Sequence, residues 1–243
     1  MKSLPSILAL STALAPSTVL ALIGNSWEFA SAPSTGLKDV TFPFNIAHAP
    51  HESGYYFAQQ FNFLGVPDVG YTGLQPRPDS NGKSIVHAAF SSFQEGTTTG
   101  HPNCHDGADG GSGVSCAVDI EGDYSHTYNL VVETSGARTW KGTLVDTVTG
   151  SATVVGEWTL PSGAGNIKNG QLGFVEYYPW NGQPSHTCDS LPKTEATFFY
   201  PTSKTSGASG GSIPKPYEYG DCIGKAGYSA TQVSSGWDIK VGS

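Results

Sequence analysis

The sequence predicts an all-β protein, a two-sheet antiparallel β-sandwich of the jelly-roll or concanavalin-like type. Many short stretches alternate apolar and polar residues, and clusters of glycine, asparagine and serine separate them. Aromatic residues make up 11% of the chain and charged residues only 13%, with 31 glycines, a composition typical of secreted β-proteins. No stretch after the N-terminus keeps a helical apolar period, and no internal repeat indicates a propeller or solenoid.

The N-terminus, residues 1–21, has the pattern of a secretory signal peptide. One positive charge at Lys2 precedes a short apolar run, and Val19 and Ala21 have the spacing of a cleavage site. Pro5 and Pro16 interrupt the run, which argues against a membrane anchor. We therefore expect cleavage after Ala21 and a secreted, extracellular protein with no membrane segment.

The remaining chain divides into one sandwich domain, residues 22–201, and a C-terminal part. Within the domain we expect strands at 40–47, 55–63, 69–75, 83–93, 127–135, 138–146, 152–160, 170–178 and 194–201. Pro43 lacks an amide donor, so the first of these strands should lie at a sheet edge. The short TSGA and TVTG links are typical of hairpins.

Residues 202–216 have the Gly/Ser/Pro-rich composition of a linker. The cysteines suggest that residues 217–243 nevertheless stay attached to the domain. Four cysteines in an exported protein indicate two disulfides, and we favour the local pair Cys104–Cys116, which leaves Cys188–Cys222. A metal bound by cysteines is the alternative, but the thiols lack the spacing of zinc sites. The second bond would hold the tail, which should end in a β segment near 228–239.

The charge of the chain limits its partners. Its formal net charge is −8, and it has only two arginines, Arg77 and Arg138. Nucleic acid requires a basic surface, which this composition does not offer. We expect a monomer that interacts with a neutral or weakly charged polysaccharide, or with a ligand held through a metal.

Five stretches of the sequence resemble a known family: GYYFAQQFNF, GYTGLQ, SIVHAAFSSF, CHDGADGGSGVSC and CDSLPKTEATFFYP. Together they are similar to secreted fungal and actinobacterial β-proteins classed as a DUF3472-like domain of unknown function. The resemblance covers roughly residues 54–201. It implies secretion, a β-sandwich and a loose association with carbohydrate-acting proteins. It implies no catalytic residues.

The glycine-rich segment NCHDGADGGSGVSC could hold a metal. Asp106 and Asp109 offer carboxylates beside glycines with exposed carbonyls, which suits calcium. No known calcium-loop pattern fits their spacing. The other interpretation is a purely structural turn, in which the aspartates accept hydrogen bonds from their own backbone. In either case we expect the disulfide to fix a long loop between strands.

Three residues are candidates for catalysis: Glu176, His87 and Tyr177. Glu176 lies in FVEYYPW beside three aromatic residues, and carboxylates perform acid–base chemistry in glycoside hydrolases. A lyase would need a histidine or tyrosine base, which His87 or Tyr177 could supply, with Gln75 nearby. The alternatives are a solvated strand carboxylate and a hydrogen-bonded core histidine.

Aromatic rings can also bind sugars without catalysis. Tyr178 and Trp180 fall near a strand end, where exposed rings could stack on a sugar, and Gln75 could contribute a hydrogen bond. The sequence therefore predicts a secreted carbohydrate-binding protein, with possible calcium as the only cofactor. A polysaccharide-cleaving hydrolase or lyase is the second reading, and an effector-type protein that contacts other proteins is the third.

Overall fold

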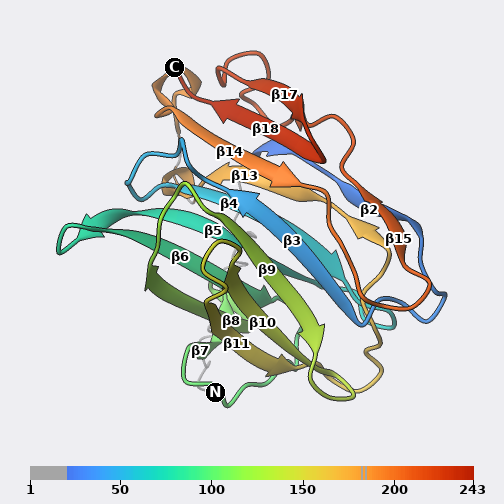
Figure 1. Ribbon diagram of the computed structural model, residues 1–243. Coiled ribbons are helices and arrows are strands. Elements are labelled where there is room, and N and C mark those ends of the chain that lie inside the picture. The colour runs from blue at the N-terminus through green and yellow to red at the C-terminus, as the bar shows by residue number, and fades with distance from the viewer. Residues whose placement is uncertain (1–20, 182, 184) are drawn as a thin grey trace, which may run out of the picture.

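The computed structural model describes residues 21–181, 183 and 185–243, and it confirms the two-sheet antiparallel β-sandwich (Figure 1). The predicted signal peptide lies outside these residues except for Ala21. One sheet has eight strands in the order β16 (Tyr217–Glu218), β1 (Ala21–Gly24), β13 (Gly173–Tyr177), β4 (Tyr55–Asn62), β5 (Val69–Ser80), β6 (Lys83–Ser92), β8 (Gly111–Glu121) and β7 (Cys104–Ala108).

The facing sheet has seven strands, and a small third sheet lies at one side (Figure 1). The order of the seven is β11 (Ala152–Thr159), β10 (Thr139–Asp146), β9 (Thr127–Thr134), β3 (Asp39–Asn45), β14 (Thr194–Phe199), β18 (Gly236–Val241) and β17 (Ser229–Val233). The small sheet contains β12 (Gly170–Gln171), β2 (Trp27–Ser31) and β15 (Ser209–Ser212). Two short 3₁₀ helices, η1 (Tyr178–Trp180) and η2 (Cys188–Ser190), complete the described elements. No helix in the described part of the chain is long and apolar enough to cross a membrane.

The core lies between the two large sheets and is rich in aromatic rings. Alternate residues of β4 to β6 point into it, including Phe57, Phe61 and Phe90, all fully buried. The facing sheet contributes Trp140 and Trp158, and each ring packs against Phe63, next to the end of β4. Because side chains alternate along a strand, the other residues of the eight-stranded sheet point outward.

The strand Asp39–Asn45 does not lie at a sheet edge, contrary to the sequence-based expectation. It runs between β9 and β14 in the middle of its sheet. Pro43 is tolerated there because the ladder with β14 pairs only Phe44 and Asn45. Its missing amide hydrogen therefore falls where the ladder is interrupted.

The glycine-rich segment 104–116 is not a loop, and that prediction is wrong. It forms the antiparallel hairpin β7–β8, in which Cys104 and Cys116 are direct cross-strand partners. The turn places Asp109 at φ 47° and Gly110 at φ 77°, the left-handed pair that a two-residue hairpin requires. Aspartate followed by glycine is a favoured sequence for this turn, so the glycines serve strand geometry and not an open loop.

Both predicted disulfides, Cys104–Cys116 and Cys188–Cys222, are present. The second connects η2 to the C-terminal part of the chain. Residues 202–216, which the composition suggested as a linker, contribute β15 to the small sheet. The final strands β17 and β18 extend the seven-stranded sheet beyond β14.

Candidate active site

A row of small residues crosses the outer face of the eight-stranded sheet. Ala58 pairs with Gly73, Gly73 with Ala89, and Ala89 with Ala117, so the row spans β4, β5, β6 and β8. Gly73 has no room for a side chain, because a Cβ there would approach the Phe57 carbonyl oxygen to 2.1 Å and the Tyr56 ring to 2.8 Å. Larger side chains stand on both sides of the row. Ala58 and Gly73 are buried, so the sheet carries a trough whose open floor is Ala89 on β6 and Ala117 on β8.

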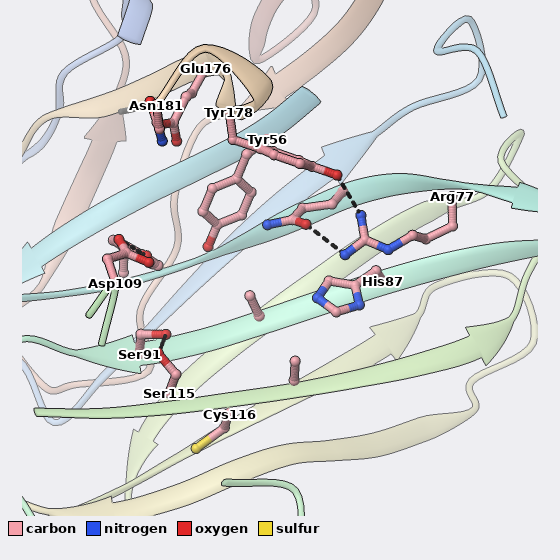
Figure 2. Close-up of a pocket in the computed structure, with 14 residues that line it drawn as sticks. Tyr56, Arg77, His87, Ser91, Asp109, Ser115, Cys116, Glu176, Tyr178 and Asn181 are labelled. Carbon is pink, nitrogen blue, oxygen red and sulfur yellow. Dashed lines mark hydrogen bonds between the residues drawn. The ribbon is translucent and has the colours of Figure 1, made fainter. Parts of the chain in front are cut away.

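This trough forms an outer cleft of about 420 Å³ (Figure 2). Tyr56, Gln75, His87 and Glu176 line one side of the row, and Arg77 and Tyr178 close it at that side. Tyr71, Ser91, Ser115 and Asp109 line the other side. Every large wall residue except Asp109, Tyr178 and Asn181 comes from a strand of the sheet, which makes the cleft a rigid surface.

Glu176 is the buried carboxyl of the cleft. Its residue is only 5% exposed, and its Oε1 accepts a hydrogen bond of 2.5 Å from Asn181 Nδ2. Burial raises the pKa of Glu176, and the negative charge of Asp109 raises it further, while the Asn181 hydrogen bond opposes both. Glu176 therefore retains a proton at a higher pH than an ordinary glutamate. That property suits a group that both accepts and returns a proton.

Tyr56 is the cross-strand neighbour of Glu176. Its hydroxyl is buried and has no hydrogen-bond partner among the described residues. Figure 2 shows the ring in the cleft below Glu176, with the hydroxyl turned toward the side of Asp109. Buried polar groups in native proteins nearly always have a partner. The Tyr56 hydroxyl therefore has no acceptor among the described residues, and it belongs to a residue that lines the cleft, which makes it a candidate donor to a bound ligand.

Gln75 is oriented by Arg77. The Arg77 Nη2 donates to Gln75 Oε1 over 2.8 Å, and its Nη1 donates to the Tyr178 hydroxyl over 3.2 Å (Figure 2). The amide oxygen of Gln75 is thereby fixed toward Arg77. None of the hydrogen bonds among the described residues uses Gln75 Nε2, so this NH₂ group can donate to a ligand.

The β7–β8 hairpin reaches the cleft through its tip. The Tyr71 hydroxyl on β5 donates to Asp109 Oδ2 over 2.8 Å. β6 lies between β5 and the nearer strand of the hairpin, β8, so the tip must fold back over the sheet face. The Cys104–Cys116 bond joins β7 to β8 at the base of this hairpin.

The structure brings five of the predicted site residues together: Glu176, His87, Gln75, Tyr178 and Asp109. His87 Nδ1 lies 2.7 Å from Asp119 Oδ1. Burial lowers the pKa of His87, and the Arg77 charge lowers it further, although Asp119 opposes the change. His87 is therefore mostly uncharged near neutral pH.

Three predicted residues lie outside the cleft. Tyr177 follows Glu176 on β13 and so points to the opposite face, where its ring packs on Tyr55 at 5.0 Å. Trp180 is buried and stacks on His186 at 4.5 Å, so its face is not open to a sugar. Asp106 is exposed on β7 and does not line the cleft.

The calcium prediction for Asp106 and Asp109 stays a prediction. Asp109 uses one oxygen for Tyr71, and Asp106 is exposed and does not line the cleft. Among the described residues, the one cluster with metal-ligating side chains close together is His186, Cys188 and Cys222. Its two sulfur atoms are joined in a disulfide, which leaves no thiolate to bind a metal.

Sequence reasoning missed Tyr56, Tyr71, Arg77 and Asn181 as site residues. Strand alternation does place Tyr56 on the face opposite Tyr55 and Phe57, so its outward direction could be predicted. Arg77 reaches the Tyr178 hydroxyl across 101 positions of the chain. Asn181 is only five positions from Glu176, but their contact depends on how the chain turns at η1. No local pattern contains that information.

No family model matches the chain, and no curated protein matches it. Among solved structures, scytalido-glutamic peptidase with a peptide-based transition state analogue is similar at 13% identity and a TM-score of 0.48, covering 92% of this chain and 100% of that one. A second structure of that peptidase, with a transition state analogue inhibitor, has 12% sequence identity and a TM-score of 0.49, and it also covers 92% of this chain and 100% of its own. SCP-B, a member of the Eqolisin family of peptidases in a complex with the tripeptide Ala-Ile-His, is similar at 12% sequence identity and a TM-score of 0.46. The match covers 93% of this chain and 99% of that one.

These comparisons contradict the predicted carbohydrate-interacting function, because the similar structures are described as peptidases. The structure also gives a physical reason for the error. Trp180, which the sequence suggested as a sugar-stacking ring, is packed against His186. Tyr177, suggested as a catalytic base, packs on Tyr55. Sequence identities and TM-scores this low do not show that this chain has the same activity. Its function therefore has to be argued from the cleft.

Proposed function

We propose that this protein is a peptidase that binds an extended polypeptide in the outer cleft and hydrolyses one of its peptide bonds. The observation that carries the proposal is the pairing of a buried Glu176 carboxyl with the unpartnered Tyr56 hydroxyl beside it. One group can move a proton and the other can donate a hydrogen bond to a carbonyl oxygen. Peptide-bond hydrolysis needs both functions at the same point.

The shape of the cleft favours an extended chain. Its floor contains the small residues Ala89 on β6 and Ala117 on β8, so a ligand backbone can lie close to the sheet there. The cleft is open to solvent, and polar groups line both sides of the row. A polypeptide presents carbonyl oxygens at regular intervals, which matches hydrogen-bond donors fixed on a rigid sheet.

The chemistry follows from the positions of the three groups. Ionised Glu176 accepts a proton from a water molecule as the water oxygen bonds to the carbonyl carbon. The Tyr56 hydroxyl and the Gln75 Nε2 group donate to the carbonyl oxygen, which gains negative charge in that step. Glu176 then returns the proton to the nitrogen as the carbon–nitrogen bond breaks. The water is consumed and the carboxyl regains its starting charge.

We further infer that the protein acts outside the cell. Its two disulfides support this location, because such bonds persist in oxidising compartments.

The test is hydrolysis of an unfolded protein substrate across acidic and neutral pH, followed by mass spectrometry of the products. We expect the native protein to cleave it and Glu176→Gln to lose about 10²–10⁴-fold in rate, the usual contribution of a general acid–base group. Tyr56→Phe should lose at least about tenfold, as expected for one donor to the developing oxyanion.

Glu28→Gln serves as the matched control, because Glu28 is an exposed glutamate on β2 outside the cleft. This variant should cleave at the native rate. The proposal is wrong if the native protein cleaves no peptide bond at any pH tested. It is equally wrong if Glu176→Gln is as active as Glu28→Gln.

A further inference from the structure

A second, apolar pocket opens beside the outer cleft. Its volume is about 260 Å³, and its apolar walls are Val69, Phe93, Phe174 and Tyr219. It shares Tyr71, Asp109 and Glu176 with the outer cleft. The two spaces thus meet at the Tyr71–Asp109 hydrogen bond and have the buried carboxyl in common.

The walls belong to an apolar cluster outside the main core. Tyr56, Ala58, Ala89 and Phe174 are buried together on the outer face of the sheet, and Tyr71, Tyr178 and Tyr219 pack against them. The Tyr71 ring contacts Phe93 at 4.7 Å and Phe174 at 6.0 Å. Apolar surface of this kind on a solvent-facing sheet is typical of a binding site.

The C-terminal part of the chain, which is attached through the Cys188–Cys222 disulfide, completes the pocket. Tyr219 follows β16, and the Cys188–Cys222 bond fixes the chain three residues later. The pocket is therefore built from β4, β5 and β13, from Phe93 after β6, from Asp109 at the hairpin tip and from a segment at the far end of the sequence. Disulfide anchoring of a wall residue keeps the space open at a constant size.

We propose that the apolar pocket seats one large apolar side chain of the polypeptide in the outer cleft. This inference rests on the proposed peptidase function. The volume is below the roughly 300–1,000 Å³ of pockets that hold drug-sized ligands, and it suits a single phenylalanine or leucine side chain. Because the pocket adjoins Glu176, the scissile bond lies next to that residue, and the protein cleaves beside large apolar residues.

Binding can be tested apart from cleavage. The probes are two blocked peptides that differ only in a central phenylalanine or alanine, titrated into Glu176→Gln by calorimetry. We expect the phenylalanine peptide to bind at least about tenfold more tightly, the lower end of what an apolar pocket discriminates. Adding Val69→Phe fills the pocket, so the phenylalanine and alanine peptides should then bind equally well. Adding Val148→Phe, the same change at an exposed turn, should preserve the preference for phenylalanine.

The inference is overturned if neither peptide binds, if both bind equally, or if Val69→Phe leaves the ratio unchanged. Cleavage of the same peptides by the protein with Glu176 intact then separates the two proposals. Phenylalanine-selective binding without Glu176-dependent cleavage would retain the pocket and reject the peptidase. Glu176-dependent cleavage without a preference for phenylalanine would retain the peptidase and reject the pocket.

Discussion

Glu176 links the chemistry of the cleft to the stability of the fold. Its carboxyl is buried, and its pKa is raised first by burial and then by Asp109. Over the pH range between the ordinary and the raised value, the folded protein holds a proton that the unfolded chain has already lost. The free energy of unfolding therefore falls as the pH rises through that range.

Glu176→Gln should remove this dependence, because glutamine has the same shape and no charge. We expect the variant to have a higher melting temperature than the native protein at about pH 8, and a similar one at about pH 4, where both side chains are neutral. Calorimetric melting at both pH values measures the difference. A variant that is less stable than the native protein at the higher pH would contradict a raised pKa for Glu176.

Single residues of the site could be predicted where residue type and sequence neighbours sufficed. Glu176 was chosen for its aromatic neighbours, and His87 and Gln75 for their residue type, and all three line the outer cleft. Tyr177 was chosen as a possible base and Trp180 as a sugar-stacking ring, yet both pack against other side chains. Exposure near a strand end depends on the neighbouring elements, which the local sequence does not specify.

The Cys104–Cys116 disulfide of the β7–β8 hairpin requires a glycine in the facing sheet. Gly156 on β11, in the facing sheet, lies directly against the Cys104–Cys116 bond. A Cβ at this position would lie 2.4 Å from the Cys116 Cβ and 2.6 Å from the Cys104 Sγ. The glycine therefore lets the disulfide pack between the two sheets.

Gly156→Ala should destabilise the protein by about 1–3 kcal/mol, the usual cost of overpacking a core. The cost should shrink in part when Cys104 and Cys116 are both replaced by alanine, because both sulfur atoms that the new methyl group meets are gone and only the Cβ at position 116 remains. Denaturant unfolding of the single, double and triple variants gives this coupling energy.

Gly100→Ala is a suitable control, because nothing lies within 4 Å of a Cβ at that position. Its unfolding free energy should remain within about 0.5 kcal/mol of the native value, as is usual for surface changes. If Gly156→Ala costs the same with and without the disulfide, the proposed packing between Gly156 and the sulfur atoms is wrong.

Elements were predictable where the apolar and polar residues alternate clearly. Every expected strand of the domain appears, although the stretch 170–178 is divided among β12, β13 and the start of η1. The hairpin at 104–121 was missed because its glycines and aspartates have the composition of a loop. The two residues Asp109 and Gly110 contained the relevant signal, since that pair favours a tight hairpin turn.

At the scale of the whole molecule, the cleft depends on a strand order that no local pattern contains. β13 pairs with β4 although more than 100 residues separate them in the chain, and this pairing places Glu176 beside Tyr56. The fold class follows from composition and periodicity, which are distributed along the whole chain. The cleft follows from a few long-range pairings, so it required the structure.

The aromatic core carries the sheet on which the cleft is built. Trp158 of β11 is 1% exposed and stacks on Phe90 of β6 with ring centroids 4.6 Å apart. Ala89, the residue before Phe90, lies in the floor of the cleft. The contact between the two sheets therefore supports the cleft floor from below.

Trp158→Ala should destabilise the protein by about 3–5 kcal/mol, because it leaves a large cavity between the sheets. Trp158→Phe should cost much less, since it retains a ring against Phe90 and removes a buried indole N–H that has no hydrogen-bond partner among the described residues. Denaturant unfolding measures both variants. If the phenylalanine variant is as unstable as the alanine variant, the stacked ring is not what holds the two sheets together at this point.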